Sequence, residues 1–185
     1  DLMRWGDMRS VADTAGFILI VPQGYKDHRG SPHWNVGSWT IGSTVDDIGF
    51  IEQIINRTSD EFNLDLKRVY SYGHSNGGYF SFELACQLGN KIAAIGSIGG
   101  TMSTESYDSC EPSHNTSVIT VHGTSDPIVY YTGGRPYNSK SQVETLRYWV
   151  DFNNTNISPE IIEVPDSDKN DGSQVELYKY DGGTN

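Results

Sequence analysis

The sequence predicts an α/β fold in which a mostly parallel β-sheet carries helices on both faces. The chain has 185 residues, which suits one domain with one hydrophobic core. Helix-like and strand-like segments alternate along it, as is typical of a parallel sheet. The first strand-like segment, residues 17–21, is continuously apolar and is followed by Pro22. Such a run is expected of a strand that is buried on both faces.

The first half of the chain begins this alternation. Residues 7–15 resemble the end of a helix that leads into the strand at 17–21. Residues 22–44 are rich in Gly, Ser, Pro and Trp, so we expect a long loop, of the kind that is usually functional. Asp46 and Asp47 then open a helix, because acidic residues favour a helix N-terminus and apolar residues follow at helical spacing.

The second half of the chain continues the same pattern. Ser141 and Glu144 have the spacing of a capping box, which marks a helix start. Strands are predicted at residues 68–72, 92–98, 117–122 and 175–180, and helices at 76–88 and 141–152. We therefore treat residues 1–185 as a single domain.

Composition and charge exclude several classes of protein. Hydrophobic residues make up 36% and charged residues 20%, so the chain is globular and not disordered. No apolar run is long enough to cross a bilayer, which predicts a soluble chain. The net charge of −11 repels phosphate groups, so we expect neither nucleic acid nor an anionic membrane as a partner.

The two cysteines, Cys86 and Cys110, match no metal-binding spacing, so they either pair or are both buried thiols. Cys86 lies on the helix predicted at 76–88, and Cys110 lies in the loop after the next predicted strand. Because consecutive elements are usually neighbours, we expect the two to form a disulfide. A disulfide would favour a secreted or periplasmic location.

The motif that carries chemistry is Gly73-His74-Ser75-Asn76-Gly77, a G-x-S-x-G sequence between a predicted strand and a predicted helix. In this setting the serine lies at the tip of a tight turn, where a Cβ on either glycine is expected to collide. The turn lifts the Ser75 hydroxyl above the carboxyl end of the sheet. The backbone N–H of Asn76, at the helix start, can face a developing oxyanion.

A serine nucleophile needs a histidine base and an acid that orients it. In enzymes built on such a turn, the chain order is serine, then the acid, then histidine. Asp126 fits the acid, because it lies in the loop just after the strand predicted at 117–122. No other acid competes in that loop; the next along the chain is Glu144, inside a predicted helix.

These motifs belong to a longer series of matches. The chain resembles the polyhydroxybutyrate (PHB) depolymerase and feruloyl esterase group of α/β-hydrolases. The matching segments follow one another in family order and are ADTAGF (12–17), PQG (22–24), WN (34–35), VDDIGFI (45–51), RVYSYGHSNGG (68–78), LAC (84–86), CEP (110–112), HGTSD (122–126), YTGG (131–134) and Trp149.

The resemblance implies an α/β-hydrolase with Ser75 as nucleophile, Asp126 as triad acid and Asn76 as one oxyanion donor, and with no metal or organic cofactor. In the family, a strand ending in a His-Gly loop precedes the part that matches Asp1, and a Gly-Gly-His segment follows the last strand. We therefore expect the domain to be incomplete at both ends and the catalytic histidine to lie just beyond Asn185.

The five histidines of the chain fit the role of base poorly. His74 is next to Ser75 within the turn, His114 precedes a strand, and His122 ends one. His28 and His33 lie in the loop on the correct side, but they come before the serine in the chain.

Aromatic residues near the predicted site are candidates for binding an acyl group or an aromatic ring. Trp34 and Trp39 lie in the loop at 22–44, and Tyr130 and Tyr131 follow Asp126. Trp34 and Tyr131 belong to matching segments, and for each of the four residues ordinary packing is the alternative explanation.

The sequence thus predicts a serine carboxylic-ester hydrolase that acts on a small or polymeric ester through an acyl-enzyme on Ser75. A serine peptidase or an acyltransferase on the same fold is the alternative within enzymes, since fold does not fix function. A non-catalytic binding module is the alternative outside them, because the expected histidine is not among those in the chain.

Overall fold

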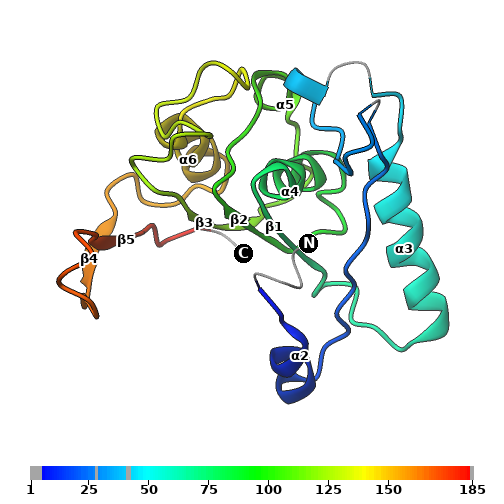
Figure 1. The fold of residues 1–185 in the computed structure, drawn as a ribbon. Coiled ribbons are helices and arrows are strands. Elements are labelled where there is room, and N and C mark those ends of the chain that lie inside the picture. The colour runs from blue at the N-terminus through cyan, green and yellow to red at the C-terminus, as the bar shows by residue number, and fades with distance from the viewer. Residues whose placement is uncertain (1–5, 28, 41–42, 184–185) are drawn as a thin grey trace.

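The computed structural model describes residues 6–27, 29–40 and 43–183 (Figure 1). In chain order the elements are α2 (Arg9–Ala15), the 3-10 helix η1 (Ser38–Thr40), α3 (Asp47–Glu61), β1 (Tyr70–His74), α4 (Asn76–Gln87), β2 (Ala94–Ile98), α5 (Thr104–Ser109), β3 (Ser117–Val121), α6 (Gln142–Phe152), β4 (Glu160–Val164) and β5 (Val175–Lys179). Helices and strands alternate through most of the chain, and the structure is of the α/β type.

Strands β1, β2 and β3 form a parallel sheet in that order. The register pairs His74 with Ile98 and Ile98 with Val121, so the three strands end at the same edge. Each strand lies within two residues of its predicted bounds. Because the chain leaves all three strands at this edge, the residues that follow them are brought together there.

Helix α4 provides the core that holds the sheet in place. It lies directly on β1 and β2 (Figure 1), and most of its side chains are buried. Phe82 of α4 is fully buried and stacks on Trp149 of α6 at 6.2 Å between ring centres. A helix that is apolar on most sides is expected in a core position between a sheet and further helices.

Two helix starts follow the sequence rules for capping. The Asp46 side chain accepts the N–H of Gly49 at 2.8 Å and caps α3. The Ser141 hydroxyl accepts the N–H of Glu144, and the Glu144 carboxylate accepts the N–H of Ser141 in return. The predicted capping box of α6 is confirmed.

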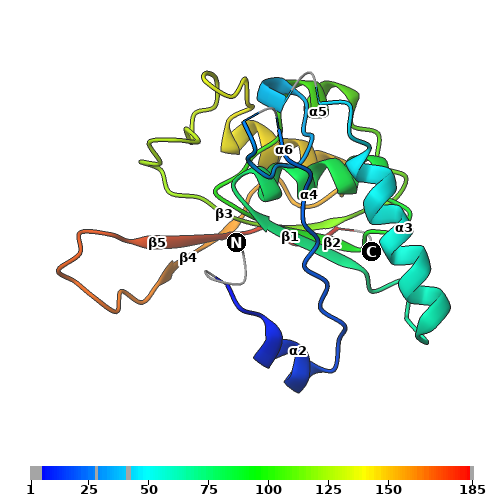
Figure 2. The ribbon, with the colours of Figure 1, turned by 45° about the vertical axis from the view of Figure 1, so that its right-hand side comes forward.

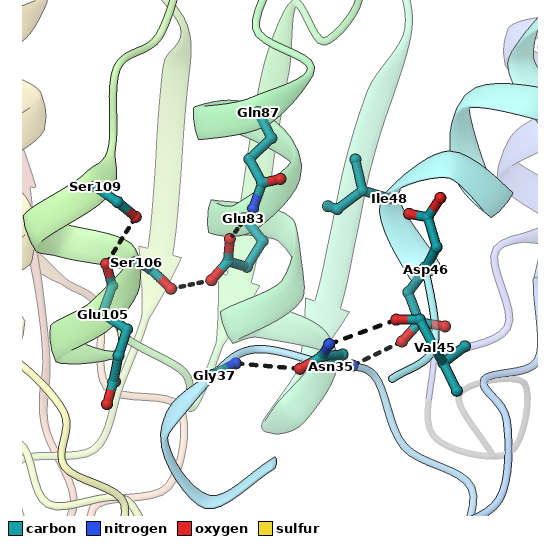
Figure 3. Close-up of a pocket in the computed structure, with 11 residues that line it drawn as sticks. Asn35, Gly37, Val45, Asp46, Ile48, Glu83, Gln87, Glu105, Ser106 and Ser109 are labelled. Carbon is teal, nitrogen blue, oxygen red and sulfur yellow. Dashed lines mark hydrogen bonds between the residues drawn. The ribbon is translucent and has the colours of Figure 1, made fainter. Parts of the chain in front are cut away.

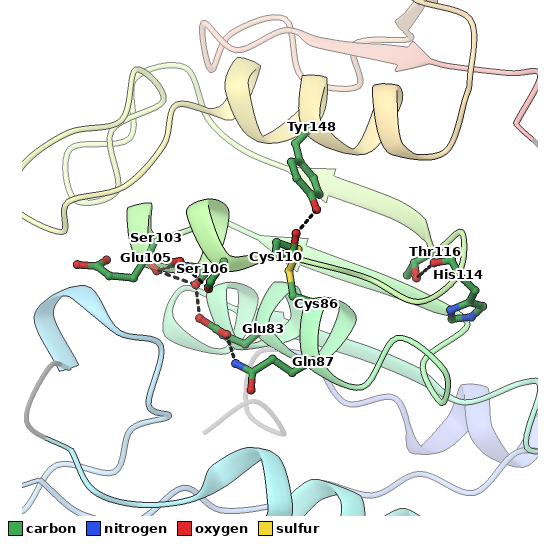
Figure 4. Close-up of a disulfide and its surroundings, with 11 residues drawn as sticks. Glu83, Cys86, Gln87, Ser103, Glu105, Ser106, Cys110, His114, Thr116 and Tyr148 are labelled. Atoms are coloured by element: carbon green, nitrogen blue, oxygen red, sulfur yellow. Dashed lines mark hydrogen bonds between the residues drawn. A yellow bond between two sulfur atoms is a disulfide. The ribbon is translucent and has the colours of Figure 1, made fainter.

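A disulfide joins Cys86 of α4 to Cys110, the residue after α5, with 4.9 Å between the Cα atoms (Figure 4). Both cysteines are buried in the hydrophobic core. The Tyr148 hydroxyl of α6 donates to the Cys110 carbonyl at 2.8 Å. The disulfide and this hydrogen bond therefore connect three helices that lie on the same face of the sheet.

Removal of this disulfide is expected to destabilise the protein. Its cysteines are 24 residues apart, and closing a loop of that size contributes about 3 kcal/mol to the free energy of unfolding. We expect Cys86→Ala/Cys110→Ala to lose about that amount in urea-induced unfolding. The reduced parent protein serves as the control, because it lacks the bond but keeps both side chains. Equal stability of the oxidised parent and the double variant would contradict the expectation.

The prediction of a strand at residues 17–21 is wrong. The segment forms no strand, and four of its five side chains are 43–46% exposed. A strand requires a hydrogen-bonded neighbour, and within the described ranges no segment pairs with this one. An apolar run therefore identified a segment suited to burial but not the partner that would bury it.

The sheet carries its helical layer on one face. Figure 2 shows α4, α5 and α6 above the strands and α3 at their right-hand side, with α2 alone below them. On that second face Ile119 and Val121 of β3 are 65% and 59% exposed. Of the two helical layers that the sequence predicts, the described residues form only the first.

The last predicted strand, residues 175–180, does not extend the parallel sheet. It forms β5, which pairs antiparallel with β4 in a separate two-stranded ribbon. Strand β4 was not predicted. The ribbon projects from the body of the molecule in both views (Figures 1 and 2).

Among the described residues, no helix combines the length and the apolar character needed to cross a bilayer.

Candidate active site

Ser75 occupies the turn between β1 and α4. Its φ of 52° and ψ of −119° are strained for a residue with a side chain. The turn is held by backbone hydrogen bonds: the Ser75 N–H donates to the Ile98 carbonyl at 2.8 Å, and the Ser75 carbonyl accepts the N–H of Gly78 at 2.8 Å. Strain that is fixed in this way is typical of functional sites.

The glycines around Ser75 permit the close approach of strand and helix. A Cβ on Gly73 would lie 2.3 Å from the backbone of Gly77, as the motif predicts. A Cβ on Gly77 would meet no atom within 4 Å, so the prediction that both glycines avoid a collision is wrong for this one. The backbone of Gly77 is what a Cβ on Gly73 would collide with. A Cβ on Gly100, after β2, would lie 2.8 Å from the Ser75 carbonyl oxygen.

Asp126 lies in the loop after β3 and is fixed by two backbone N–H groups. Its Oδ1 accepts the N–H of Ile128 at 2.8 Å and that of Val129 at 3.0 Å. The Ile128 N–H makes the largest contribution to lowering the pKa of the Asp126 carboxyl below its usual value, and that of Val129 adds to it. These bonds use one oxygen and leave the other, Oδ2, directed elsewhere.

The Oδ2 atom of Asp126 faces the end of β2. A Cβ on Gly99 would lie 3.7 Å from Asp126 Oδ2 and 3.9 Å from His74 Nε2. Gly99 therefore lies close both to the Asp126 carboxylate, in the loop after β3, and to the imidazole of His74 next to Ser75. Sequence reasoning missed this glycine; the signal for it was the Gly-Gly pair directly after a predicted strand.

Asn76 lies next to Ser75 as the first residue of α4. Backbone N–H groups in the first turn of a helix have no acceptor within that helix, so the Asn76 N–H is suited to bind an oxyanion. Its side chain makes two hydrogen bonds to the backbone of Trp34, at 2.7 and 3.0 Å. Trp34 is thereby brought to helix α4, which begins directly after Ser75, and its ring stacks there on Phe80.

The other predicted aromatic contacts are less direct. Trp39 meets the rings of Tyr79 and Tyr137 edge-on at 4.7 and 4.8 Å, so packing accounts for much of its surface. Tyr131 meets the His122 ring edge-on at 5.8 Å in the loop after Asp126. Of Trp34, Trp39 and Tyr131, Trp34 is the one that is hydrogen-bonded to a residue of the G-x-S-x-G turn in the described part of the chain.

His122 is occupied by structural contacts. Its side chain is only 1% exposed, and its Nε2 lies 2.8 Å from the Val129 carbonyl oxygen. Because a carbonyl can only accept, Nε2 carries the proton. His122 Nε2 is also 3.7 Å from Asp126 Oδ2. The ring therefore supports the loop that carries Asp126.

The remaining histidines lie in different surroundings. His114 lies on the surface before β3, at the opposite end of the sheet from Ser75. The imidazole of His33 is partly buried, and its Nδ1 has no hydrogen-bond partner in the described part of the chain. His28, the other loop candidate, lies outside the described residues.

A separate cavity of about 430 Å³ lies along α3, α4 and α5 (Figure 3). Its wall includes the carboxylates of Asp46, Asp47, Glu83 and Glu105. Glu83 is buried there and accepts hydrogen bonds from Ser106 and from Gln87 (Figure 3). None of the residues proposed for catalysis lines this cavity. In the described ranges, no group of three or more His, Cys, Asp or Glu residues could hold a metal ion.

Comparison with known proteins finds relatives that are similar in sequence to this chain, although no family model matches it. The chain is 32% identical over 122 residues to "Bifunctional acetylxylan esterase/xylanase XynS20E" of Neocallimastix patriciarum, a match that covers 66% of this chain and 16% of the relative. It is 26% identical over 155 residues to "Feruloyl esterase B" of Piromyces equi, covering 79% and 27%. It is also 27% identical over 90 residues to "Poly(3-hydroxybutyrate) depolymerase" of Ralstonia pickettii, covering 48% and 18%.

The chain spans less than two thirds of the length of each of these relatives.

Proposed function

We propose that this chain, which belongs to the esterase family of the feruloyl esterases, acetylxylan esterase and PHB depolymerase, is a carboxylic-ester hydrolase with Ser75 as its nucleophile. The observation that carries the proposal is the strained, hydrogen-bonded turn of Ser75 at the carboxyl end of a parallel sheet. An α/β-hydrolase fold is part of the proposal, and the order of β1, β2 and β3 supports it.

The reaction begins with attack by the Ser75 hydroxyl oxygen on the ester carbonyl carbon. A histidine accepts the hydroxyl proton, and Asp126 holds that histidine in the correct orientation. The tetrahedral oxyanion is stabilised by the Asn76 N–H, and one such donor contributes about 3 kcal/mol to lowering the barrier. The histidine then protonates the leaving alcohol, and an acyl group remains on Ser75.

Water completes the cycle by the same steps. The histidine removes a proton from water, the resulting nucleophile attacks the acyl-enzyme, and the acid product leaves as Ser75 is reprotonated. No metal or organic cofactor enters these steps.

The base is proposed to be a histidine other than the five in this chain. His122 is buried and bonded to Val129, and His114 is at the wrong end of the sheet, so neither can reach Ser75. His74 precedes Ser75 directly, and the side of its ring that bears Nε2 faces Gly99. His28 and His33 come before the serine in the chain, whereas the base of such enzymes comes after the acid.

We also place the protein in a secreted or periplasmic setting. The disulfide between Cys86 and Cys110 supports this, because such bonds persist in oxidising compartments and are rare in the cytosol.

The experiment that tests the function is hydrolysis of four esters by the intact protein: 4-nitrophenyl acetate, methyl ferulate, acetylated xylan and poly(3-hydroxybutyrate). Turnover of at least one is expected. It should persist in His28→Ala and His33→Ala, because neither histidine is the proposed base. Loss of the general base would instead lower the rate by about 10²- to 10⁴-fold. Absence of turnover on all four would contradict the proposal. Turnover that either histidine substitution abolishes would show that the base lies in the loop at 22–44.

A further inference from the structure

The side chain of Asn76 is paired with the backbone of a distant loop residue. Its Oδ1 accepts the N–H of Trp34 at 2.7 Å, and its Nδ2 donates to the Trp34 carbonyl at 3.0 Å. The two residues are 42 positions apart in the sequence. One amide side chain thus satisfies both backbone polar groups of one loop residue.

The indole ring of Trp34 is held by the same helix. It stacks on Phe80 of α4 with 4.8 Å between ring centres and only 4° between ring planes. Phe80 is buried and lies one helical turn after Asn76, whereas Trp34 remains partly exposed. Backbone and ring are therefore both fixed against the helix that begins at the nucleophile.

The loop residues after Trp34 are fixed by other elements. The Asn35 N–H donates to Asp47 Oδ2 at 2.7 Å, and the Val36 N–H donates to Thr40 Oγ1 at 2.8 Å. Three successive backbone N–H groups are thus bound by side chains. Of the three acceptors, Asn76 is the one next to Ser75, so it alone connects the loop to the nucleophile turn.

We propose that the side chain of Asn76 is a positioning residue that holds Trp34 as a wall of the acyl-binding site and so determines the preference for bulky or planar acyl groups. The inference rests on the proposed function. The proposal places the carbonyl oxygen of the acyl-enzyme at the Asn76 N–H. It places the acyl group against Trp34, the residue whose backbone the Asn76 side chain holds. Asn76 serves the oxyanion through its backbone and the acyl group through its side chain.

The chain offers a matched control for this clamp. Asn153 also pairs its amide with one backbone residue: its Nδ2 donates to the Thr116 carbonyl at 2.8 Å, and its Oδ1 accepts the Thr116 N–H at 3.0 Å. Thr116 precedes β3 and so lies at the end of the sheet opposite Ser75. Asn153→Ala removes two hydrogen bonds of the same kind at a position away from the proposed site.

The experiment compares kcat/KM for methyl ferulate and for 4-nitrophenyl acetate in four variants of the intact protein: Asn76→Ala, Trp34→Ala, the double variant and Asn153→Ala. Asn153 begins an N-x-T glycosylation sequon with Asn154 and Thr155, so a bacterial host is used to avoid glycosylation there. We expect Asn76→Ala to lower the ferulate-to-acetate ratio about tenfold, and Trp34→Ala to lower it as much. The double variant should lower it no further, since both act through one ring. Asn153→Ala should keep the parental ratio.

An unchanged ratio in Asn76→Ala would overturn the inference, as would a double variant whose ratio falls by the product of the single effects. If Asn76→Ala does not fold, Trp34→Ala decides alone, and an unchanged ratio in that variant overturns the inference. These outcomes are read in a parent whose hydrolysis is lost in Ser75→Ala. Hydrolysis that survives Ser75→Ala overturns the proposed function and this inference together.

Discussion

Ser75→Ala is expected to abolish ester hydrolysis by the intact protein, with a fall in kcat of about 10⁶-fold. Alanine removes the attacking oxygen and leaves the other contacts of the turn in place. The hydrogen bonds at this position are made by the backbone, to Ile98, Gly78 and Tyr79, so they persist in the variant. The measurement is steady-state hydrolysis of the best ester found, together with the urea midpoint of unfolding.

Folding and activity are expected to separate in this variant. The urea midpoint should match that of the parent, because alanine carries the same Cβ and so has the same backbone strain at φ 52°. Ser125→Ala is the matched control, since Ser125 is an exposed serine beside Asp126. It should keep parental activity. A Ser75→Ala protein that retained more than about a thousandth of the parental kcat would show that another group is the nucleophile.

Asp126→Asn is expected to lower kcat by about 10⁴-fold while leaving the fold intact. The reason lies in the two N–H groups that bind Oδ1 of the carboxylate, those of Ile128 and Val129. An asparagine keeps these bonds only by placing its carbonyl oxygen there. Its NH₂ group then replaces Oδ2, and a donor stands where the histidine needs an acceptor. The histidine is left in the wrong tautomer.

The pH dependence of the parent should agree with this role. The pKa of Asp126 lies below its usual value because Ile128 and Val129 donate to the charged form, so the group stays ionised as pH falls through the range where histidine titrates. The acid limb of the pH–rate profile should therefore reflect the histidine. Glu144→Gln is the control, since Glu144 is the next acid in the chain and caps α6. Parental activity in Asp126→Asn together with loss of activity in Glu144→Gln would show that Asp126 is not the triad acid.

Much of this site could be predicted because its rules are local. A G-x-S-x-G motif between strand and helix fixes the backbone of Ser75 over a few residues, and chain order then points to Asp126. The capping box of α6 is equally local, since both of its hydrogen bonds lie within four residues. Strands β1, β2 and β3 were found because each is short and lies between clear helix or turn signals.

The parts that could not be predicted depend on a partner outside the segment itself. Residues 17–21 have the composition of a buried strand, but strand formation requires a neighbour, and composition does not provide one. Strand β4 is paired with β5 across a loop, so neither its existence nor the antiparallel direction follows from its own five residues. Whether the second face of the sheet is exposed depends on which other segments pack against it, so no single segment predicts it.

The role of the Asn76 side chain is a further case of this kind. The sequence motif predicts that the backbone N–H of Asn76 is an oxyanion donor, because Asn76 directly follows the serine. The contact of its amide with Trp34 spans 42 residues and follows from no spacing rule. Only the fold brings the long loop to the start of α4.

The central claim, that Ser75 is an activated nucleophile, is tested most directly by labelling the folded, intact protein with a fluorophosphonate and mapping the adduct by peptide mass spectrometry. Such probes phosphonylate a serine whose hydroxyl is activated by a neighbouring base. We expect a single adduct on the peptide that contains Ser75 and none in Ser75→Ala. Ester hydrolysis by a protein that stays unlabelled, or an adduct on a different serine, would contradict the claim.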